Sequence, residues 1–351
     1  MNLFIKRMIF ILPLIILLLI AYLFFNLENT AKMDNYATKE ECGVVANNTI
    51  LKKSVVNNSG MCFDIIAPNI VFDCDGNNIT FGTVEGELST GGAGVHSAFI
   101  LRESAYNVTI KNCKLFGGFG KGLETHIYAI NQDWNKIKET NYFLNNIINV
   151  TTKAWSQGMH IWNGNGIKVI NNTIYVIGKR AYGIRFEGDN DNNIVKDNYI
   201  EGYADKEGVF ITPIELSDNS EKHSTTNNTV ENNFINCFGL NENQWALYLA
   251  ETVDSFVNNN KILTNDCAGI GVNRGGGNSI SNNTIVRISG DGVGIIDYIG
   301  DNFYAGNKII NFSKWVHQPA LKSVYVNTTF INGDENVFIS RLELANTTLR
   351  A

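Results

Sequence analysis

Proline is scarce in this chain, which has 4 prolines and 32 glycines among 351 residues. Proline cannot donate a hydrogen bond within a sheet, whereas glycine supplies the positive φ of tight turns, so this ratio suits strands joined by short turns. Long charged or low-complexity runs are lacking too, and nothing indicates a disordered tail. The 5 histidines are scattered, and the C-x-x-C and His-x-x-x-His spacings of zinc sites do not occur.

Basic residues are also in deficit. The formal net charge is −6, and residues 1–33 hold three basic residues and one acidic residue, so the remainder carries −8 (−6 minus +2). Proteins that bind nucleic acid gather Lys and Arg on one face. The acidic body therefore predicts no nucleic-acid partner.

A six-residue pattern with Asn in its fourth position, as in VINNTI at residues 169–174, recurs along the chain. Its copies end 23 to 35 residues apart, at Ile148, Ile174, Ile200, Ile235, Ile262, Ile285 and Ile309. A period in this range is the signature of a repeat architecture. The shared slot holds Asn146, Asn172, Asn198, Asn233, Asn260, Asn283 and Asn307.

Each repeat consists of short apolar runs bounded by Asn and Gly, which predict strands rather than helix pairs. When such strands stack, the Asn side chains of successive coils can donate to one another's carbonyl oxygens. We therefore predict an all-β fold, a β-solenoid with an internal Asn ladder.

The N-terminal segment, residues 1–33, contains an 18-residue apolar run at 8–25 that follows Lys6 and Arg7. This run is long enough to span a bilayer, and the basic pair places its N-terminal side inside. The alternative is a cleaved signal peptide, although no A-x-A site follows the run. Both interpretations predict export, with a membrane-anchored body or, after cleavage, a secreted one.

Export makes disulfide bonds between the six cysteines possible, because an extracytoplasmic compartment permits disulfides. Cys42 and Cys62 bracket a short segment before the repeats and are predicted to form a disulfide at the open end of the stack. The other four are candidates for two further bonds or for buried thiols: Cys74 with Cys113, and Cys237 with Cys267. Their contexts are similar, but a one-slot offset could point the Cβ atoms apart.

Asn-x-Ser/Thr sequons are frequent and predict a glycoprotein if the host glycosylates. Asn171 and Asn282 alternate with ladder residues, so they should face outward. The alternative is that these sequons arise from the structural repeat, which itself contains the sequence N-N-T-I. Two long intervals, at 115–148 and 200–235, predict loops on one face of the solenoid.

The segments NVTIKNCKL, IKVINNTIYVI and SISNNTIVRI resemble the repeats of right-handed parallel β-helix proteins of the pectin-lyase-like superfamily. NIVFDCDGNNI resembles the first coil of exported members, including archaeal surface proteins and the NosD type. The resemblance covers residues 40–335. It implies one chain wound as a solenoid with three short strands per coil, over a domain at 34–335 followed by a capping segment at 336–351. For function it is unspecific, because the superfamily contains lyases, hydrolases, epimerases, adhesins and non-catalytic surface proteins.

The strands that precede the Asn segments can be aligned by their own alternation. Inward positions form two apolar columns: Met159, Ile184, Ile214, Leu247 and Ile270, and then Ile161, Phe186, Leu216, Leu249 and Val272. Outward positions form two polar columns: His160, Arg185, Glu215, Tyr248 and Gly271, and then Trp162, Glu187, Ser217, Ala250 and Asn273. The outward columns are the candidate site.

Within this face Glu187 and Glu215 should be diagonal neighbours, about 7–8 Å apart at Cα, a spacing compatible with the paired carboxylates of glycosidases. Catalysis would fall to Glu187, Glu215 and Arg185. Binding would fall to His160, Trp162, Tyr248 and Asn273, whose aromatic members can stack on sugar rings. The alternative without a ligand site is that Arg185 forms an exposed ion pair with either carboxylate, which adds little stability.

No cofactor is required by this interpretation. Calcium is conceivable at two acidic turns, formed by Asp189 with Asp191 and by Asp73 with Asp75, although Asp also caps such turns for structural reasons. A copper role resembling the NosD type is disfavoured, because only Met159 lies beside a histidine.

The sequence thus predicts an extracytoplasmic β-helix, held by its N-terminal helix to a membrane, that binds polysaccharide or glycan along one face. Two alternatives remain: a polysaccharide lyase or glycoside hydrolase that uses the same face, and a non-catalytic structural or adhesive module.

Overall fold

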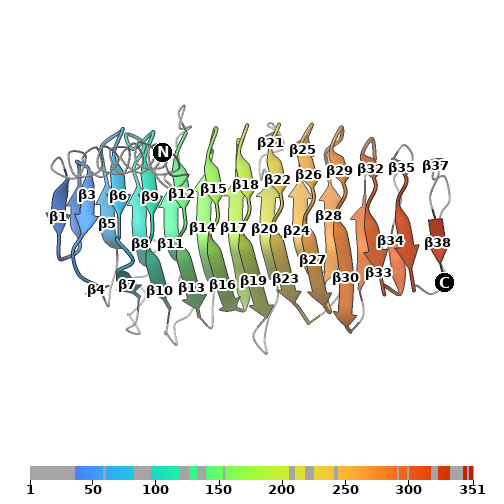
Figure 1. Cartoon of the computed structure of the whole chain (residues 1–351), viewed down its shortest axis with the longest axis horizontal. Helices are drawn as coiled ribbons and strands as arrows, with labels where there is room; N and C mark the ends of the chain where they lie inside the picture. The colour runs from blue at the N-terminus through green and yellow to red at the C-terminus, as the bar shows by residue number, and fades with distance from the viewer. Residues whose placement is uncertain are drawn as a thin grey trace, which may run out of the picture.

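The computed structural model describes residues 36–57, 61–82, 96–118, 126–132, 140–152, 155–204, 210–217, 225–240, 244–290, 292–298, 300–317, 323–332, 343–345 and 348–350. Within these ranges every regular element is a strand, and every pairing between strands is parallel (Figure 1). The strands form three long sheets, which we call A, B and C, and one short pair. All-parallel sheets built from repeated coils make the parallel β-helix that the repeats predict.

Sheet A has 13 strands, in the order β1 (Ala37–Lys39), β3 (Thr49–Leu51), β6 (Val71–Asp73), β9 (Thr109–Lys111), β12 (Tyr142–Leu144), β15 (Lys168–Ile170), β18 (Ile194–Lys196), β22 (Thr229–Glu231), β26 (Phe256–Asn258), β29 (Ser279–Ser281), β32 (Phe303–Ala305), β35 (Val324–Val326) and β37 (Glu343–Ala345).

Sheet B has 11 strands, in the order β2 (Gly43–Val45), β5 (Met61–Ile65), β8 (His96–Leu101), β11 (His126–Gln132), β14 (Trp155–Trp162), β17 (Arg180–Glu187), β20 (Phe210–Ser217), β24 (Trp245–Ala250), β28 (Ala268–Asn273), β31 (Val293–Asp297) and β34 (Lys314–His317).

Sheet C has 12 strands, from β4 (Val55–Asn57) through β7 (Asn78–Phe81), β10 (Lys114–Gly117), β13 (Ile147–Thr151), β16 (Thr173–Gly178), β19 (Tyr199–Ala204), β23 (Phe234–Phe238), β27 (Lys261–Asn265), β30 (Thr284–Ser289), β33 (Lys308–Ile310) and β36 (Thr329–Ile331) to β38 (Thr348–Arg350). The short pair is β21 (Thr225–Thr226) with β25 (Thr252–Val253).

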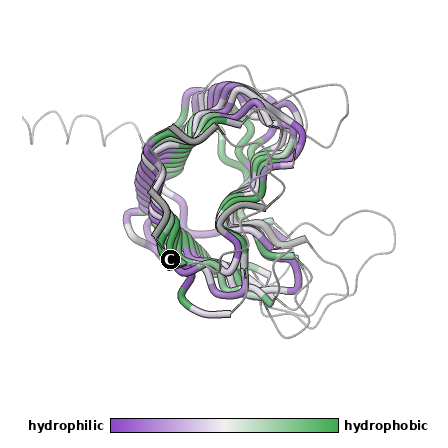
Figure 2. The backbone as a smooth tube through the Cα atoms, turned by 90° about the vertical axis from the view of Figure 1, so that its right-hand side faces the viewer, coloured by the Kyte–Doolittle hydropathy of each residue, from purple (hydrophilic) through white to green (hydrophobic). Residues whose placement is uncertain are grey.

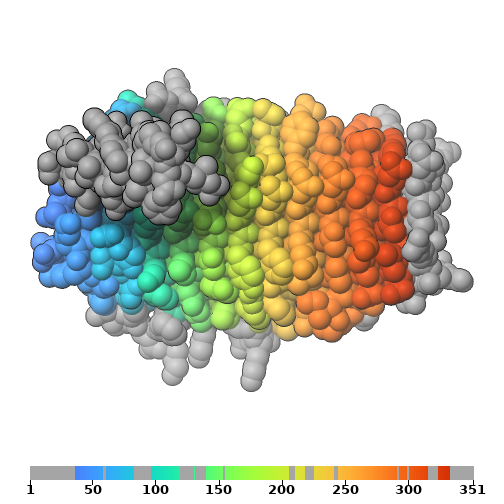
Figure 3. All heavy atoms as spheres, in the orientation of Figure 1, coloured from blue at the N-terminus to red at the C-terminus, as the bar shows by residue number. Residues whose placement is uncertain are grey.

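A coil takes one strand from each sheet, as in β15, β16 and β17, before the chain enters the next coil at β18. Parallel strands joined by such crossovers wind right-handedly. Seen along the stack, the coils superpose, and residues of similar hydropathy line up from coil to coil (Figure 2). In the space-filling view, successive coils follow one another as bands from blue to red (Figure 3).

The Asn ladder occupies the turn between sheets A and C, as predicted. Asn172 donates from its backbone N and from Nδ2 to Oδ1 of Asn198, at 2.8 and 3.0 Å, and its own Oδ1 accepts from the same two atoms of Asn146. All seven predicted ladder residues are buried. The preceding residue is often in the left-handed region, as at Asn171 (φ 55) and Asn282 (φ 55), which face solvent as predicted.

A second polar ladder, which was not predicted from the sequence, lies at the other end of the sheet A strands. Asn193 N donates to Asn228 Oδ1 (2.9 Å), Asn228 N to Ser255 Oγ (3.0 Å), and Ser255 N to Asn278 Oδ1 (3.0 Å). Each of these residues stands five positions before a residue of the first ladder. That constant offset was the available signal, although Ile167 and Ser255 interrupt the run of Asn.

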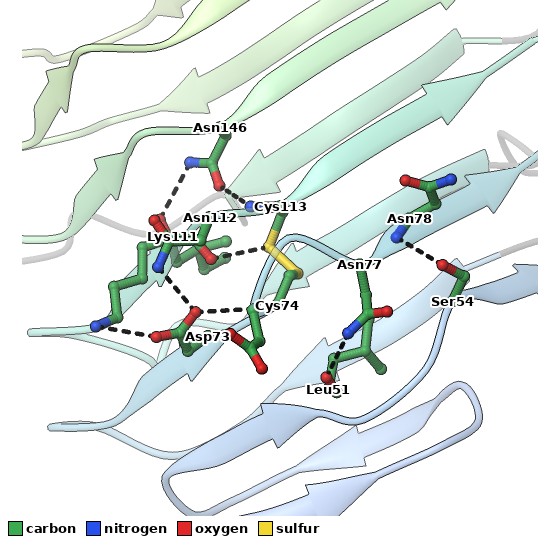
Figure 4. The surroundings of a disulfide bond; sticks show 12 residues. Leu51, Ser54, Asp73, Cys74, Asn77, Asn78, Lys111, Asn112, Cys113 and Asn146 are labelled. Carbon is green, nitrogen blue, oxygen red and sulfur yellow. Dashed lines mark hydrogen bonds and ion pairs between the residues drawn. A yellow bond between two sulfur atoms is a disulfide. The ribbon is translucent and has the colours of Figure 1, made fainter.

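All six cysteines form disulfides: Cys42 with Cys62, Cys74 with Cys113, and Cys237 with Cys267. The first was predicted, and for the other two the structure decides against buried thiols. Figure 4 shows how the offset of the second pair is resolved. Asp73 pairs with Lys111, so Cys74 would face Asn112, but Asn112 adopts φ 57 and the turn brings Cys113 to Cys74 instead.

The N-terminal apolar run at 8–25 lies outside the described residues. From residue 36 onward, no described helix is long and apolar enough to span a membrane, and the predicted anchor stays a prediction. Parts of the two long intervals, including residues 133–139 and 218–224, lie outside the described ranges as well. In the predicted capping segment, β37 and β38 continue sheets A and C beside β35 and β36.

Candidate functional site

The candidate site lies on the outer face of sheet B, over strands β14, β17, β20, β24 and β28, and we call it the sheet-B face. The predicted register is correct. His160 pairs with Arg185, Arg185 with Glu215, Glu215 with Tyr248, and Tyr248 with Gly271. The second outward column is likewise in register: Trp162, Glu187, Ser217, Ala250 and Asn273.

The inward columns confirm which way these strands face. Met159, Ile184, Ile214, Leu247 and Ile270 are completely buried in the coil core. Because neighbours on a strand point to opposite faces, the residues that follow them point out of the core. Met159 and His160 therefore lie on opposite faces of β14, and the structure does not bring together the pair considered for copper.

The outward charges, however, are not exposed, and the expectation of a solvated ion pair is wrong. His160 and Glu187 are each 7% exposed, and Glu215 is 4% exposed. The physical reason is that these side chains shield one another from solvent. Coils are stacked about 4.8 Å apart, so long side chains from neighbouring strands lie across one another. The Arg185 guanidinium sits 4.7 Å from the centroid of the Tyr182 ring and fills the space between the carboxylates.

Arg185 bridges both carboxylates. Its guanidinium lies 2.8 Å from Glu187 Oε2 through one terminal nitrogen and 3.3 Å from Glu215 Oε1 through Nε. Glu187 Oε2 also lies 3.0 Å from His160 Nε2, and the Ser217 hydroxyl donates to Glu215 Oε1 at 2.8 Å. One cation is thus shared between two acids inside a largely desolvated cluster, an arrangement in which removing one member leaves a buried charge uncompensated.

Burial shapes the ionisation of this cluster. It raises the pKa of Glu215 above its ordinary value, more than Arg185 and Ser217 lower it. It also lowers the pKa of His160, because desolvation outweighs the attraction of Glu187. For Arg185, burial opposes the charge, but Glu215, Tyr182 and Glu187 together raise the pKa. The arrangement therefore favours a charged Arg185, a neutral His160 and a Glu215 that holds its proton to higher pH than a free carboxyl group.

Several polar atoms of this face have no hydrogen-bond partner among the described residues. They are Glu215 Oε2, Thr212 Oγ1 and both amide atoms of Gln157, and Gln157 is completely buried. Leaving such groups unpaired costs about 1–3 kcal/mol each. Buried unsatisfied groups in a folded protein call for an explanation, and a bound water or ligand is one.

Gln157 was missed because β14 breaks its alternation. A Cβ added to Gly158 would come within 2.6 Å of Ile174 in the core, so Gly158 and Met159 both turn inward. Gln157 consequently points outward, in register with Tyr182, whose ring lies beside Arg185. The signal in the sequence was the recurrence of Gly at the same place in β17, in YGIRFEGD.

Aromatic rings line the face beside the charged cluster. Trp245, which was also missed, stacks on Tyr248 with ring centroids 4.5 Å apart and an interplanar angle of 16°. Both rings lie over Gly271, where an added Cβ would meet Trp245 at 2.6 Å, so this outward position has no room for a side chain. The Tyr248 hydroxyl accepts from Asn273 Nδ2 at 2.9 Å.

Trp162, at the end of β14, is half-buried on the outer face, as predicted, and its ring meets His160 edge to face at 5.8 Å. Phe210 links the other aromatics, because its ring lies 5.6 Å from Tyr182 and 5.4 Å from Trp245. The face thus joins a charged centre to a row of rings, and aromatic rings of this kind can stack on sugar rings.

The acidic turns considered for calcium lie elsewhere. Asp73 accepts from Asp75 N and Asn112 Nδ2, both at 2.9 Å, and pairs with Lys111 at 3.1 Å. Burial alone would raise the pKa of Asp73, but the hydrogen bonds from Asp75 and Asn112 and the pairing with Lys111 lower it by more. The net effect is a lowered pKa.

Asp191 accepts from the Thr226 hydroxyl at 2.6 Å, so that turn likewise has a structural role, and Asp189 donates from its backbone N to Asn163. In the described ranges, no three His, Cys, Asp or Glu side chains converge as metal ligands would.

Comparison of the sequence with protein-family profiles and with curated proteins finds no match. Comparison with solved structures does. The surface protein and adhesin PfbA of Streptococcus pneumoniae superposes with a TM-score of 0.54 at 11% identity, over 90% of this chain and 87% of that one. The periplasmic alginate epimerase AlgG gives 0.51 at 11% identity, and a double mutant of it gives 0.55 at 12%, each over 87% of this chain and 76% of the other.

At these identities the likeness concerns the fold alone. The similar structures, the parallel sheets and the stacked Asn turns agree on one architecture. The chain has the parallel β-helix fold that its resemblance to pectin-lyase-like proteins implies.

Proposed function

We propose that this protein is an exported β-helix protein that binds polysaccharide or glycan on the sheet-B face. The observation that carries the proposal is the buried, incompletely satisfied polar cluster around Arg185 and Glu215. Trp162 lies on one side of this cluster, against His160, and the stacked rings of Trp245 and Tyr248 lie on the other. Sites for sugars combine flat apolar faces with a few fixed polar groups, and this face supplies both.

The similar structures support the same direction. One acts on alginate, a polysaccharide, and the other is a surface adhesin. Fold alone does not decide function, so the chemistry of the sheet-B face carries the proposal.

Export and anchoring are part of the proposal. Three disulfides suit an oxidising, extracytoplasmic compartment. The apolar run at 8–25 would hold the body to a membrane, or direct secretion if it is cleaved. Solvent-facing sequons, such as those at Asn171 and Asn282, would accept glycans in a host that glycosylates.

Cleavage of the bound glycan, by a polysaccharide lyase or glycoside hydrolase, is a second candidate favoured by one observation. Burial raises the pKa of Glu215, as the general acid of a glycosidase requires, and Glu187 lies diagonally beside it and shares Arg185. In such a reaction Glu215 would donate a proton to the leaving oxygen while Glu187 remained a carboxylate.

A glycan array probed with the full chain in mild detergent, followed by product analysis of every hit, tests the proposal. We expect binding to a defined glycan class. The Trp162→Ala variant should lose about tenfold or more in affinity through lost stacking, and should melt within a few degrees of wild type.

Trp155→Ala is the matched control, because Trp155 lies at the other end of β14, stacked with Arg180, away from the charged centre. Turnover of a bound glycan would identify an enzyme. Silence across the array would leave the structural or adhesive module as the better description and end the glycan proposal.

A further inference from the structure

We infer that the sheet-B face selects an uncharged glycan, one that offers hydroxyl groups and no carboxylates. This inference rests on the proposed function and narrows it to a ligand class. The charged groups of the face already pair with one another, whereas several neutral polar groups have no hydrogen-bond partner among the described residues.

The central cation is not available to an anionic sugar. Arg185 contacts Glu187 at 2.8 Å and Glu215 at 3.3 Å, and its side chain is only 12% exposed. A uronate carboxylate could reach it only by displacing one of these acids, which would then remain buried without a partner. His160 offers no compensating positive charge, because burial lowers its pKa.

The groups without a partner call for neutral hydrogen bonding instead. Gln157 has an amide donor and an amide acceptor, Thr212 has a hydroxyl, and Glu215 has a second carboxyl oxygen, all buried without partners among the described residues. Sugar hydroxyls both donate and accept, so they match this mixed set, whereas a carboxylate can only accept. An acidic sugar would also bring a further negative charge beside two acids that already share a single arginine.

Arg180 provides the internal contrast. It stands at the start of β17, five residues before Arg185, and its guanidinium lies 4.5 Å from the Trp155 ring centroid. No carboxylate partner of Arg180 exists among the described residues. If the protein bound acidic polysaccharide, this half-buried cation would be the group to recruit it.

The decisive measurement compares two probe sets with the full-length protein: neutral gluco-, manno-, xylo- and galacto-oligosaccharides, and oligogalacturonates with alginate oligosaccharides. Dissociation constants are measured at about 50 and about 500 mM NaCl, because salt screens charge pairing and leaves neutral contacts nearly unaffected. We expect binding within the neutral set, with affinities that change less than about twofold between the two salt concentrations.

Two variants sharpen the result. Gln157→Leu keeps the side-chain size and removes both amide groups, so it should weaken neutral binding about fivefold or more. Arg180→Ala should leave that binding unchanged. The salt comparison needs no variant, so it stands even if Gln157→Leu fails to fold.

Tighter binding of uronates than of neutral sugars, with loss of affinity in salt or upon Arg180→Ala, would overturn the inference and leave the proposed glycan function intact. Absence of binding to either set, together with silence on the wider array, would overturn the proposed function itself.

Discussion

Glu215 is the residue whose chemistry depends most on its surroundings. On the sequence alone it is one of two acids on the outward face, one in each column, and an ordinary surface carboxylate would be expected. In the structure it is 4% exposed, one oxygen contacts Arg185 and Ser217, and the other has no partner among the described residues. Its column was predictable by alternation, whereas its burial was not, because burial depends on side chains from three neighbouring coils.

The raised pKa of Glu215 has a consequence for stability. A group whose pKa is raised on folding favours the folded state fully below its unfolded pKa, about 4.3, and loses that contribution as pH rises through the folded pKa. We therefore expect Glu215→Gln, which does not ionise, to gain in melting temperature relative to wild type as pH rises above about 4.3.

Thermal unfolding of both proteins at pH 4, 5.5 and 7 measures this difference. A difference that stays constant over the range would mean that Glu215 titrates normally. Asp75→Asn, on an exposed turn, is the control substitution of one acid by its amide, measured at the same three pH values.

The turns between strands carry much of the architecture at the scale of elements. The first Asn ladder could be predicted because successive coils place Asn at the same turn, so that each side-chain amide can hydrogen-bond to the next. The second ladder was harder to read, because its slot holds Asn, Ser or Ile, and only its constant five-residue offset from the first ladder marks it.

Asn172→Leu tests the first ladder. The substitution removes the acceptor of Asn146 N and Nδ2, and it removes the donor to Phe143 O, which lies 2.9 Å from Asn172 Nδ2. Buried groups left unpaired cost about 1–3 kcal/mol each, so we expect a clear drop in the free energy of unfolding in a urea titration.

Asn149→Leu is the matched control, since Asn149 is half-exposed on sheet C and lies outside the ladder. It should change the unfolding free energy by less than about 0.5 kcal/mol. Equal stability of the two variants would show that the ladder contributes nothing of its own.

The whole molecule is a stack in which each coil buries the apolar surface of its neighbours. A disulfide is therefore expected to contribute most to stability at an end of the stack, where a coil has only one neighbour. The Cys42–Cys62 bond spans 20 residues at the start of the stack, and the Cys74–Cys113 and Cys237–Cys267 bonds span 39 and 30 residues farther along. Loops of these lengths correspond to about 3–4 kcal/mol each in the chain-entropy description.

Non-reducing peptide mapping of oxidatively folded protein should recover three cross-linked pairs with these partners. The double variant Cys42→Ser with Cys62→Ser should unfold at lower urea concentration than wild type, because the first coil loses its closure. Recovery of any of the six as a free thiol, or a different pairing, would contradict this arrangement.

The sequence by itself determined the repeat, the strands, the Asn ladder and the faces of the sheet B strands, because each follows from spacing along the chain: a period of one coil and an alternation of two residues. Tertiary structure alone decided the rest. The turn at Asn112 brought Cys113 to Cys74, and the inward turn at Gly158 placed Gln157 outside. The burial of Arg185 between two acids likewise arises from side chains of different coils, whose mutual cover no single stretch of sequence contains.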